Sequence, residues 1–554
     1  MARVAKAERS AHQSVPSHFR DLVPQRETSD QLVQLYLRTF ESVHRVLHIP
    51  SFQQEYNEYW SNPQAASTAF VTKLLLVMAI GACFYKDPNS PTYLRSSSSQ
   101  WIHAAQSWLG PPFEKSRLNL TGLQIQCLLL IARQTSAVGG DLVWISAGTL
   151  VRTAMNIGLH LDPSHFPKMS IFHSELRRRL WATILEISIQ SSLDIGMLPL
   201  ISLHDFDCEP PSNLDDVQIN EDTTTLPTPK LDIFTQTSVQ IALMRSFSTR
   251  LEIVKLINDF RSEPSYDETL RLSAELTTTM RSISLLFRSF LSSSSLTEHE
   301  RPPAFPNKLL DTLTRRFLLS LHRPFAIKAK TNPKYYFSRK TCVDSALQIL
   351  HTRAQDNEYN IFAIPGTGIC RSIWVLAITT ICFELITQLE EDSSPFSPTS
   401  IHSLSRNELH KAIRDSIDLA ARRIEAGETN VKSHVMLASI LGQIDAMIAG
   451  TSPEQGILDA AKRTVELCCG LLTARAEESA ARQAQGVGDG REDVGFQGDG
   501  IGSGWDVLVS LTEYAGCMYG LLTKFALQME QPNLDFEIPD SWLFSGWGSS
   551  TSWS

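Results

Sequence analysis

The sequence has little positive charge for its length. Its 554 residues carry 50 lysines and arginines against 59 aspartates and glutamates, which gives a formal net charge of −9. A protein that binds nucleic acid directly normally presents a basic surface, because contacts with phosphates supply much of the affinity. The chain as a whole has no such basic surface, so a DNA-binding module would have to be visible as a local motif.

Paired cysteines are also missing. The nine cysteines include no C-x2-C pair, which is the spacing that many zinc sites use. Most of them lie inside apolar stretches, and an odd number of scattered thiols is typical of a reducing compartment. The cysteines are Cys83, Cys127, Cys208, Cys342, Cys370, Cys382, Cys468, Cys469 and Cys517.

A secretory leader and long apolar runs are absent as well. Residues 1–19 are polar and of mixed charge, so we expect no secretory signal. The two most apolar stretches, 74–85 and 372–383, have about a dozen residues each, whereas a helix that spans a bilayer needs about 20. We interpret both as buried core helices and expect no membrane partner.

Helical periodicity dominates what is present. In 29–47, Ser29 is a candidate N-cap, and apolar residues follow at three- and four-residue steps: Leu32, Tyr36, Phe40 and Val43. Similar patterns predict helices at roughly 66–86, 97–108, 121–136, 141–160, 173–195, 232–261, 267–292, 308–321, 338–354, 369–390, 406–426, 431–449, 454–475 and 504–529. Strand alternation is scarce, so we predict an all-α fold, a large multi-helix domain with disordered loops and tail.

Composition divides the chain into five segments. We expect a disordered N-terminal segment at 1–28, one helical domain at 29–475, a disordered Gly-rich linker at 476–504, a C-terminal helix at 505–530 and an acidic-aromatic tail at 531–554. Within the helical domain, a connection that begins at Asp205 carries seven carboxylates up to Asp222 and no Lys or Arg.

Four ordered stretches carry a resemblance to a known family. They are Tyr36-x3-Phe40-x2-Val43-His44 with His48-Ile49-Pro50-Ser51-Phe52; Trp144-x3-Gly148-x3-Arg152-x-Ala154 with Gly158-Leu159-His160-x-Asp162; Glu175-x-Arg177-Arg178-Arg179-x-Trp181 with Ser192-x3-Gly196 and the acidic connection; and Leu321-His322-Arg323-Pro324-Phe325 with Ser338-Arg339. Together they resemble the middle homology region of fungal zinc-cluster transcription factors over about 36–345. Departures from the family pattern occur at Ala182, Ser188 and 196–199, which indicates a divergent branch.

The resemblance implies a nuclear regulator that controls a pathway-specific gene set, biosynthetic or catabolic, such as a secondary metabolism gene cluster. In the family, six N-terminal cysteines bind two zinc ions, and an adjoining helix enters the DNA major groove. Here the first cysteine is Cys83, inside a predicted core helix. We therefore expect no cofactor and no metal in this sequence, and promoter DNA to be reached through a DNA-binding partner or through a module missing from the gene model.

Arg177, Arg178 and Arg179 form the most basic cluster of the chain. A nuclear localisation signal or a phosphate-binding patch is one interpretation. The apolar residues around them, such as Leu176 and Leu180, place the cluster on an amphipathic helix, and arginine pairs readily with carboxylates. We favour structural pairing with carboxylates such as those of the acidic connection.

Metal-binding and catalytic motifs are weak. His44 and His48 have the spacing of zinc ligands, but Arg45 stands where the H-E-x-x-H motif needs glutamate. Asp215-Asp216 lacks the third carboxylate of the DDxxD motif of terpene synthases, and no phosphate-binding loop or G-x-S-x-G elbow occurs. We predict that the chain is not an enzyme and assign no catalytic, cofactor-binding or metal-binding residue. Gly158 is expected to end a helix, with a turn at 162–164.

Two interpretations of the C-terminal tail stay open. Acidic residues alternate there with Trp542, Phe544 and Trp547, which is typical of a segment that docks onto a coactivator, but these aromatics could equally pack onto the helical body. A DNA-binding protein or a second copy of the chain is a further expected partner. The alternative function is a ligand-responsive helical module, for which the sequence names no pocket residue.

Overall fold

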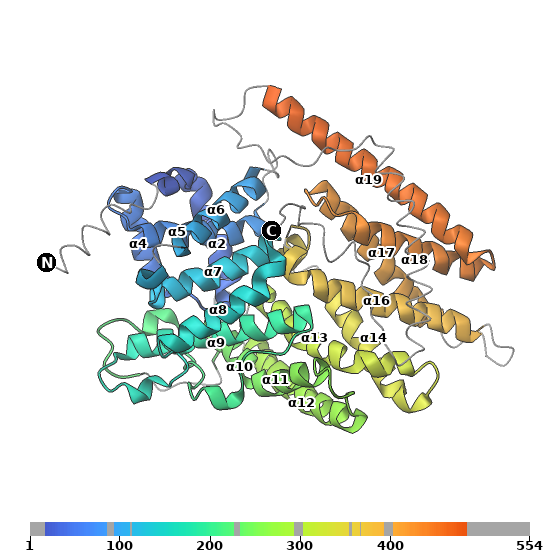
Figure 1. Cartoon of the computed structure of the whole chain (residues 1–554), viewed down its shortest axis with the longest axis horizontal. Helices are drawn as coiled ribbons and strands as arrows, with labels where there is room; N and C mark the ends of the chain where they lie inside the picture. Colours follow the sequence, from blue (N-terminus) through green and yellow to red (C-terminus); the bar gives the residue numbers. More distant parts are fainter. Residues whose placement is uncertain are drawn as a thin grey trace, which may run out of the picture. The chain divides into compact units, whose positions relative to one another are not determined.

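The structure is a computed structural model that describes residues 17–484 except 86–92, 111–113, 227–232, 293–302, 354–356, 366 and 393–402. Across these ranges the chain forms α-helices and short 3-10 helices, and no strand occurs (Figure 1). The predicted all-α fold is thereby confirmed. The helices belong to two compact units, one up to Leu437 and one from Ala438, which are described separately.

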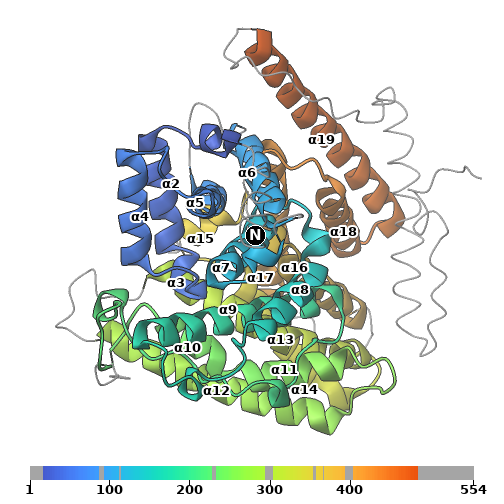
Figure 2. The ribbon, with the colours of Figure 1, turned by 60° about the vertical axis from the view of Figure 1, so that its left-hand side comes forward.

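The first unit begins with helices that surround one buried helix. The elements are η1 (Ser17–Leu22), α2 (Arg26–Arg38), α3 (Glu41–His44), α4 (Ile49–Ser61) and α5 (Thr68–Gly81). Nearly every residue of α5 is buried, and α2 packs against it (Figure 2). The close approach needs Gly81, because a Cβ there would lie 2.1 Å from the carbonyl oxygen of Leu32.

The prediction of a disordered segment at 1–28 is wrong from Ser17 onward, while 1–16 lie outside the described residues. Phe19 is buried, and the indole of Trp101 donates to the carbonyl oxygen of Leu22 at 2.9 Å. Arg20 donates to the carbonyl of Ala66 at 2.8 Å. These tertiary contacts order a stretch that looks polar in sequence, and α2 already begins at Arg26.

Helix α4 is absent from the predicted set. His48 caps it by accepting a hydrogen bond from the Ser51 amide, and Pro50 occupies its first turn. Its buried residues, Phe52, Tyr56 and Tyr59, recur at helical spacing, but exposed Gln, Asn and Glu residues dilute the apolar signal.

The next elements of the first unit include its central helix, α9. The elements are η2 (Ala82–Phe84), α6 (Tyr93–Leu109), η3 (Glu114–Arg117), α7 (Leu120–Ser136), η4 (Gly140–Leu142), α8 (Val143–Asn156), η5 (Pro163–His165) and α9 (Ile171–Ile195). Helices α7, α8 and α9 lie side by side (Figure 1). Every residue from Arg179 to Ser192 is buried, so this part of α9 is enclosed on all sides rather than amphipathic as predicted.

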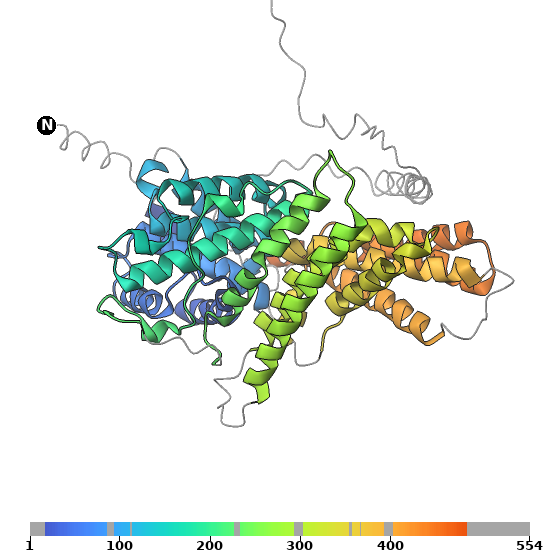
Figure 3. The same cartoon turned by 90° about the horizontal axis from the view of Figure 1, so that it is seen from below.

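The remaining elements of the first unit pack around α9 and α13. They are η6 (Leu203–Asp205), η7 (Asp216–Gln218), α10 (Ser238–Arg245), α11 (Phe247–Ile257), α12 (Tyr266–Ser292), α13 (Ala304–Lys328), η9 (Pro333–Tyr335), α14 (Tyr336–Leu350), α15 (Asn357–Phe362), α16 (Thr367–Asp392) and α17 (Ser403–Glu425). Helices α12 and α13 run alongside each other (Figure 3). The acidic connection begins at Asp205, the last residue of η6, and contains η7.

Helix α16 is longer than the predicted apolar run at 372–383. Its stretch Ser372–Asp392 has 21 residues and is long and apolar enough to cross a membrane by length and composition, a test that buried core helices also meet. Ile373, Ala377, Ile381 and Leu385 are buried, and α16 packs against α7, α14 and α17. These contacts are those of a core helix.

The second unit contains the end of α18 (Lys432–Ala449) and helix α19 (Pro453–Ala484). The two helices approach closely where Gly442 faces Gly456, because a Cβ on Gly442 would lie 2.4 Å from the carbonyl oxygen of Gly456. The prediction of a disordered linker from 476 is wrong for 476–484, which continue α19. The rest of that linker, the helix at 505–530 and the tail at 531–554 lie outside the described residues.

Candidate functional site

The segment between α3 and α4 places an arginine inside the protein. Arg45 ends α3 with φ 49° and ψ 51°, a left-handed conformation that a non-glycine residue rarely adopts. Its side chain is 1% exposed, although arginine is almost never buried without a partner. A strained backbone and a buried charge at one residue mark this position as a candidate site.

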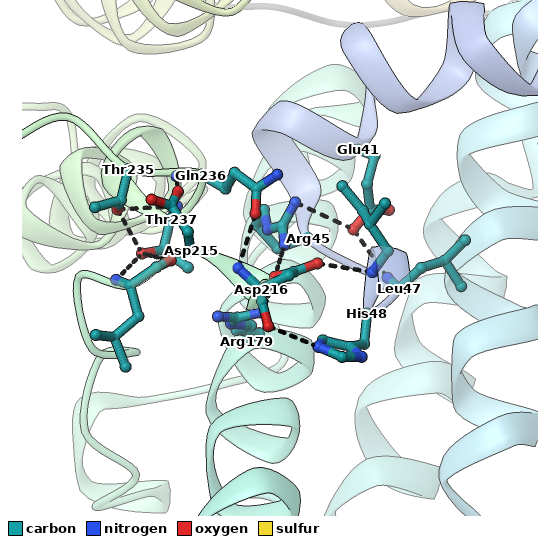
Figure 4. A network of polar contacts seen from close by, with 12 residues as sticks. Glu41, Arg45, Leu47, His48, Arg179, Asp215, Asp216, Thr235, Gln236 and Thr237 are labelled. Carbon is teal, nitrogen blue, oxygen red and sulfur yellow. Dashed lines mark hydrogen bonds and ion pairs between the residues drawn. The ribbon is translucent and has the colours of Figure 1, made fainter. Parts of the chain in front are cut away.

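Asp216, at the start of η7, is the partner of Arg45. Its Oδ1 accepts hydrogen bonds from Nη2 of Arg45 and, at 2.5 Å, from Nη1 of Arg179 (Figure 4). Its Oδ2 accepts from the Ile49 amide at 2.7 Å. Both arginine side chains and the carboxylate are 1% exposed. One carboxylate therefore joins the α3–α4 connection, the central helix α9 and the acidic connection.

The main-chain atoms of Asp216 also form hydrogen bonds with neighbouring segments. The Asp216 carbonyl oxygen lies 3.0 Å from Nε2 of His48, and its amide donates to Oε1 of Gln236 at 2.8 Å. In return, the Gln236 amide donates to Oδ1 of Asp215 at 2.8 Å. The two aspartates thus have different roles: Asp216 faces the buried arginines, while Asp215 holds the start of the α10 segment (Figure 4).

Glu41 flanks the arginine from the other side. Its carboxylate accepts hydrogen bonds from the Tyr36 hydroxyl at 2.5 Å and from the Leu47 amide at 2.9 Å, and it lies 3.8 Å from Nη1 of Arg45. Burial raises the pKa of Glu41 to about 7, against the attraction of Arg45. The carboxylate thus contacts the turn between α3 and α4 through Oε1 and Tyr36 of α2 through Oε2.

Electrostatics distinguish the two arginines. Burial acts to lower the pKa of Arg45, but the charges of Asp216 and Glu41 outweigh it and raise that pKa. Burial and repulsion by Arg45 lower the pKa of Arg179. The two guanidinium groups hold the pKa of Asp216 below its usual value in spite of burial. Asp216 is thus held ionised between two positive charges.

The other two arginines of the cluster have different partners. Arg178 donates to both oxygens of Asp162, at 3.0 and 3.1 Å, and to Oε1 of Glu175 at 2.9 Å. Arg177 donates to the carbonyl oxygen of Ile157 at 3.1 Å. Pairing with carboxylates thus holds for Arg178 and Arg179 but not for Arg177, and only one of the carboxylates, Asp216, belongs to the acidic connection.

A second buried ion pair lies further along α9. Arg250 of α11 donates to both carboxylate oxygens of Glu186, each at 2.8 Å. The Glu186 side chain is 5% exposed and that of Arg250 is fully buried. Burial acts to raise the pKa of Glu186, but the charge of Arg250 prevails and lowers it. Buried ion pairs at Arg179 and at Glu186 therefore fix helix α9 to its neighbours.

The predicted turn after α8 is confirmed, since Gly158 has φ 76° and Asp162 accepts a hydrogen bond from the Ser164 amide.

His44 and His48 do not converge on one point. Nδ1 of His48 lies 2.7 Å from the Ser51 hydroxyl, and both ring nitrogens of His44 are buried without a hydrogen-bond partner among the described residues. No group of three or more His, Cys, Asp or Glu that could hold a metal occurs within the described ranges. The two zinc ions that the resemblance implies therefore do not fit the residues seen there.

Sequence analysis missed Arg45 and did not assign a role to Asp216. The sequence signal was the position of Arg45 between apolar residues, since Val43, Val46 and Leu47 are all buried. A lone charge in such a run indicates a buried ion pair, but nothing local identifies a carboxylate 171 positions away. Because all these charges are enclosed, the site can fix the relative position of segments but cannot reach a substrate in solution.

The residues of the ionic network lie in a region that is similar to known proteins. The fungal specific transcription factor domain family matches residues 33–321, which include Arg45, Arg179 and Asp216. The transcription factor lepE of Aspergillus flavus is 36% identical over 94% of this chain and 66% of its own length. The transcription factor opdR of Penicillium oxalicum is 38% identical over 83% of this chain and 61% of its own length. The aspyridones cluster regulator apdR of Emericella nidulans is 33% identical over 81% of this chain and 59% of its own length.

The chain thus spans about three fifths to two thirds of the length of these relatives. No solved structure matches it.

Proposed function

Because the chain belongs to the fungal specific transcription factor domain family, we propose that it is a nuclear transcriptional regulator of a pathway-specific gene set. The observation that carries the proposal is the match over 33–321 together with relatives named as transcription factors over most of this chain. One of these relatives is named as the aspyridones cluster regulator, which supports control of one gene cluster.

The ionic network supports a regulatory rather than a catalytic role. Asp216 and Glu186 are two buried carboxylates of the helical core, and each is paired with buried arginine. A general acid or base must reach its substrate, which these enclosed groups cannot do. In this proposal the chain is not an enzyme, binds no cofactor, and uses its helical body to connect other components of a promoter complex.

Contact with DNA is the part of the proposal that needs a partner. With a net charge of −9 and no zinc-binding group within the described ranges, the helical body offers DNA no reading surface. We propose that promoter DNA is reached through a DNA-binding partner, a second copy of the chain or a zinc-cluster module, and that the 531–554 tail contacts a coactivator.

Chromatin occupancy tests the proposal without assuming how DNA is reached. The tagged chain is crosslinked in cells of its host, and the DNA that co-purifies is sequenced. We expect discrete peaks at the promoters of one functionally related gene set. The same tagged strain, processed without crosslinking, gives the background signal. Exclusion from the nucleus with no enriched promoter would contradict the proposal.

A further inference from the structure

A pocket lies at the outer end of the α4–α5 hairpin, away from the ionic network. Its volume is about 310 Å³. Residues of α4, the α4–α5 connection, α5 and the first turn of α7 line it. Small-molecule sites have volumes of about 300–1,000 Å³, so this pocket is at the lower end of that range.

A buried cation lines one side of the pocket. Lys73 of α5 is 8% exposed, which is unusual for a lysine because burial of an ammonium group is costly without a counter-ion. Its Nζ lies 3.1 Å from Oε2 of Glu55, whose side chain is 45% exposed. Glu55 can rotate towards solvent, whereas Lys73 cannot, so an incoming anion could replace the glutamate at Nζ.

Other groups around Lys73 favour a carboxylate. Thr121 is the second residue of α7, and Ala69 is the second residue of α5, so two helix N-termini meet at the pocket. The first backbone N–H groups of a helix lack intrahelical acceptors and attract negative charge. The Tyr59 side chain also lies on the wall of the pocket.

The lining of the pocket is also acidic. Glu55 and Glu58 of α4 both line it, and Glu58 is exposed. A simple anion would meet these two carboxylates as it approached Lys73, which weakens its binding. A ligand that carries a positive group beside its carboxylate would instead be attracted by the lysine and by the carboxylates.

The wall also contains two aromatic rings, Tyr59 and Phe70, whose centroids are 6.0 Å apart. We propose that this pocket binds a small zwitterion of the amino-acid type, with its carboxylate at Lys73 and its ammonium group at Glu55 and Glu58. The aromatic rings favour an apolar or aromatic side chain. The pocket gives the ligand-responsive alternative a defined site and goes beyond the proposed transcriptional role, which does not require it.

Three matched probes test the proposal by isothermal titration calorimetry on the full chain. L-Phenylalanine carries both charges, 3-phenylpropionate lacks the ammonium group and phenethylamine lacks the carboxylate. We expect saturable binding of L-phenylalanine and at least about tenfold weaker binding of each analogue, since a lost ion pair of about 1.4 kcal/mol is a factor of ten. No saturable binding of L-phenylalanine, or equal binding of either analogue, overturns the proposal.

Variants locate the site. Lys73→Met, which keeps the length of the side chain, should abolish binding of L-phenylalanine, while the control Lys340→Met changes an exposed lysine of α14 and should leave it unchanged. Glu58→Gln, at an exposed position, should weaken binding of L-phenylalanine at least threefold and strengthen binding of 3-phenylpropionate, because it removes a carboxylate that repels this anion. If circular dichroism shows that Lys73→Met does not fold, binding of L-phenylalanine to Glu58→Gln tests the proposal instead. Binding that Glu58→Gln leaves unchanged contradicts the proposal, whatever chromatin occupancy shows.

Discussion

Arg45 and Asp216 are 171 positions apart in the sequence and form an ion pair in which each side chain is 1% exposed. A buried pair of this kind adds little net stability, because desolvation offsets the attraction of the charges. Removing one partner is much more costly, since it leaves an uncompensated charge inside. The pair therefore makes the α3–α4 connection and the acidic connection dependent on each other, and Arg179 couples both to α9.

Substitution of Asp216 is the first test of this network. Asp216→Asn keeps the shape but leaves Arg45 and Arg179 without their shared anion, so we expect a loss of about 3–5 kcal/mol in the free energy of unfolding of the first unit. Urea unfolding followed by circular dichroism measures it. The control, Asp222→Asn, changes an exposed carboxylate of the same connection and should have an effect within about 0.5 kcal/mol. Equal effects of the two variants would contradict the network's role.

A double-mutant cycle tests the second ion pair. We expect Glu186→Leu or Arg250→Met alone to cost about 3–5 kcal/mol, because each leaves one buried charge unpaired. The double variant should be more stable than either single variant, with a coupling energy of at least about 2 kcal/mol. Urea unfolding of the four proteins gives the cycle. Additive losses would show that the two side chains act independently.

His44 predicts a pH dependence of stability. Burial lowers its pKa to about 4, whereas the unfolded chain has a value near 6.5. The unfolded state therefore takes up a proton first as the pH falls, so the free energy of unfolding should drop by about 3 kcal/mol between pH 6.5 and pH 4 from this group alone. His44→Phe, which keeps the ring beside Phe40, removes this component. Parallel pH profiles of the two proteins would contradict the prediction.

Arg178 tests whether the arginine cluster depends on paired geometry. Lysine cannot reproduce the two parallel hydrogen bonds that Arg178 makes with Asp162, so Arg178→Lys should lower the free energy of unfolding by about 1–2 kcal/mol. Arg281→Lys, at an exposed position of α12, is the matched control. Thermal unfolding midpoints measure the difference. An Arg178→Lys variant with the midpoint of the wild type would mean that positive charge alone suffices.

Much of the fold was predictable because helical periodicity is a local property. The buried stripe of α2 and the turn at Gly158 follow from residues within one or two turns of each other. Helix α4 was missed because its buried aromatics alternate with strongly polar residues, and the end of α19 was missed because composition alone indicates a linker there. For α4, packing of these aromatics, which is not a local property, decided the outcome.

The candidate site was less predictable for the same reason. Pairing of the arginine cluster could be inferred from the carboxylates nearby, and Arg178 and Asp162 are only 16 positions apart. Arg45 and Asp216 meet only because α9 brings distant connections together. The pocket at Lys73 likewise combines α4, α5 and α7, and no sequence pattern marks a lysine as buried.

Transcript abundance in the host shows in one experiment whether the ionic network is needed for regulation. The gene is deleted and complemented with the wild-type chain, Asp216→Asn or Asp222→Asn, and total RNA is sequenced. We predict that deletion changes one related gene set, and that the wild type and Asp222→Asn restore it but Asp216→Asn does not. Unchanged transcripts after deletion, or equal restoration by Asp216→Asn, would contradict it.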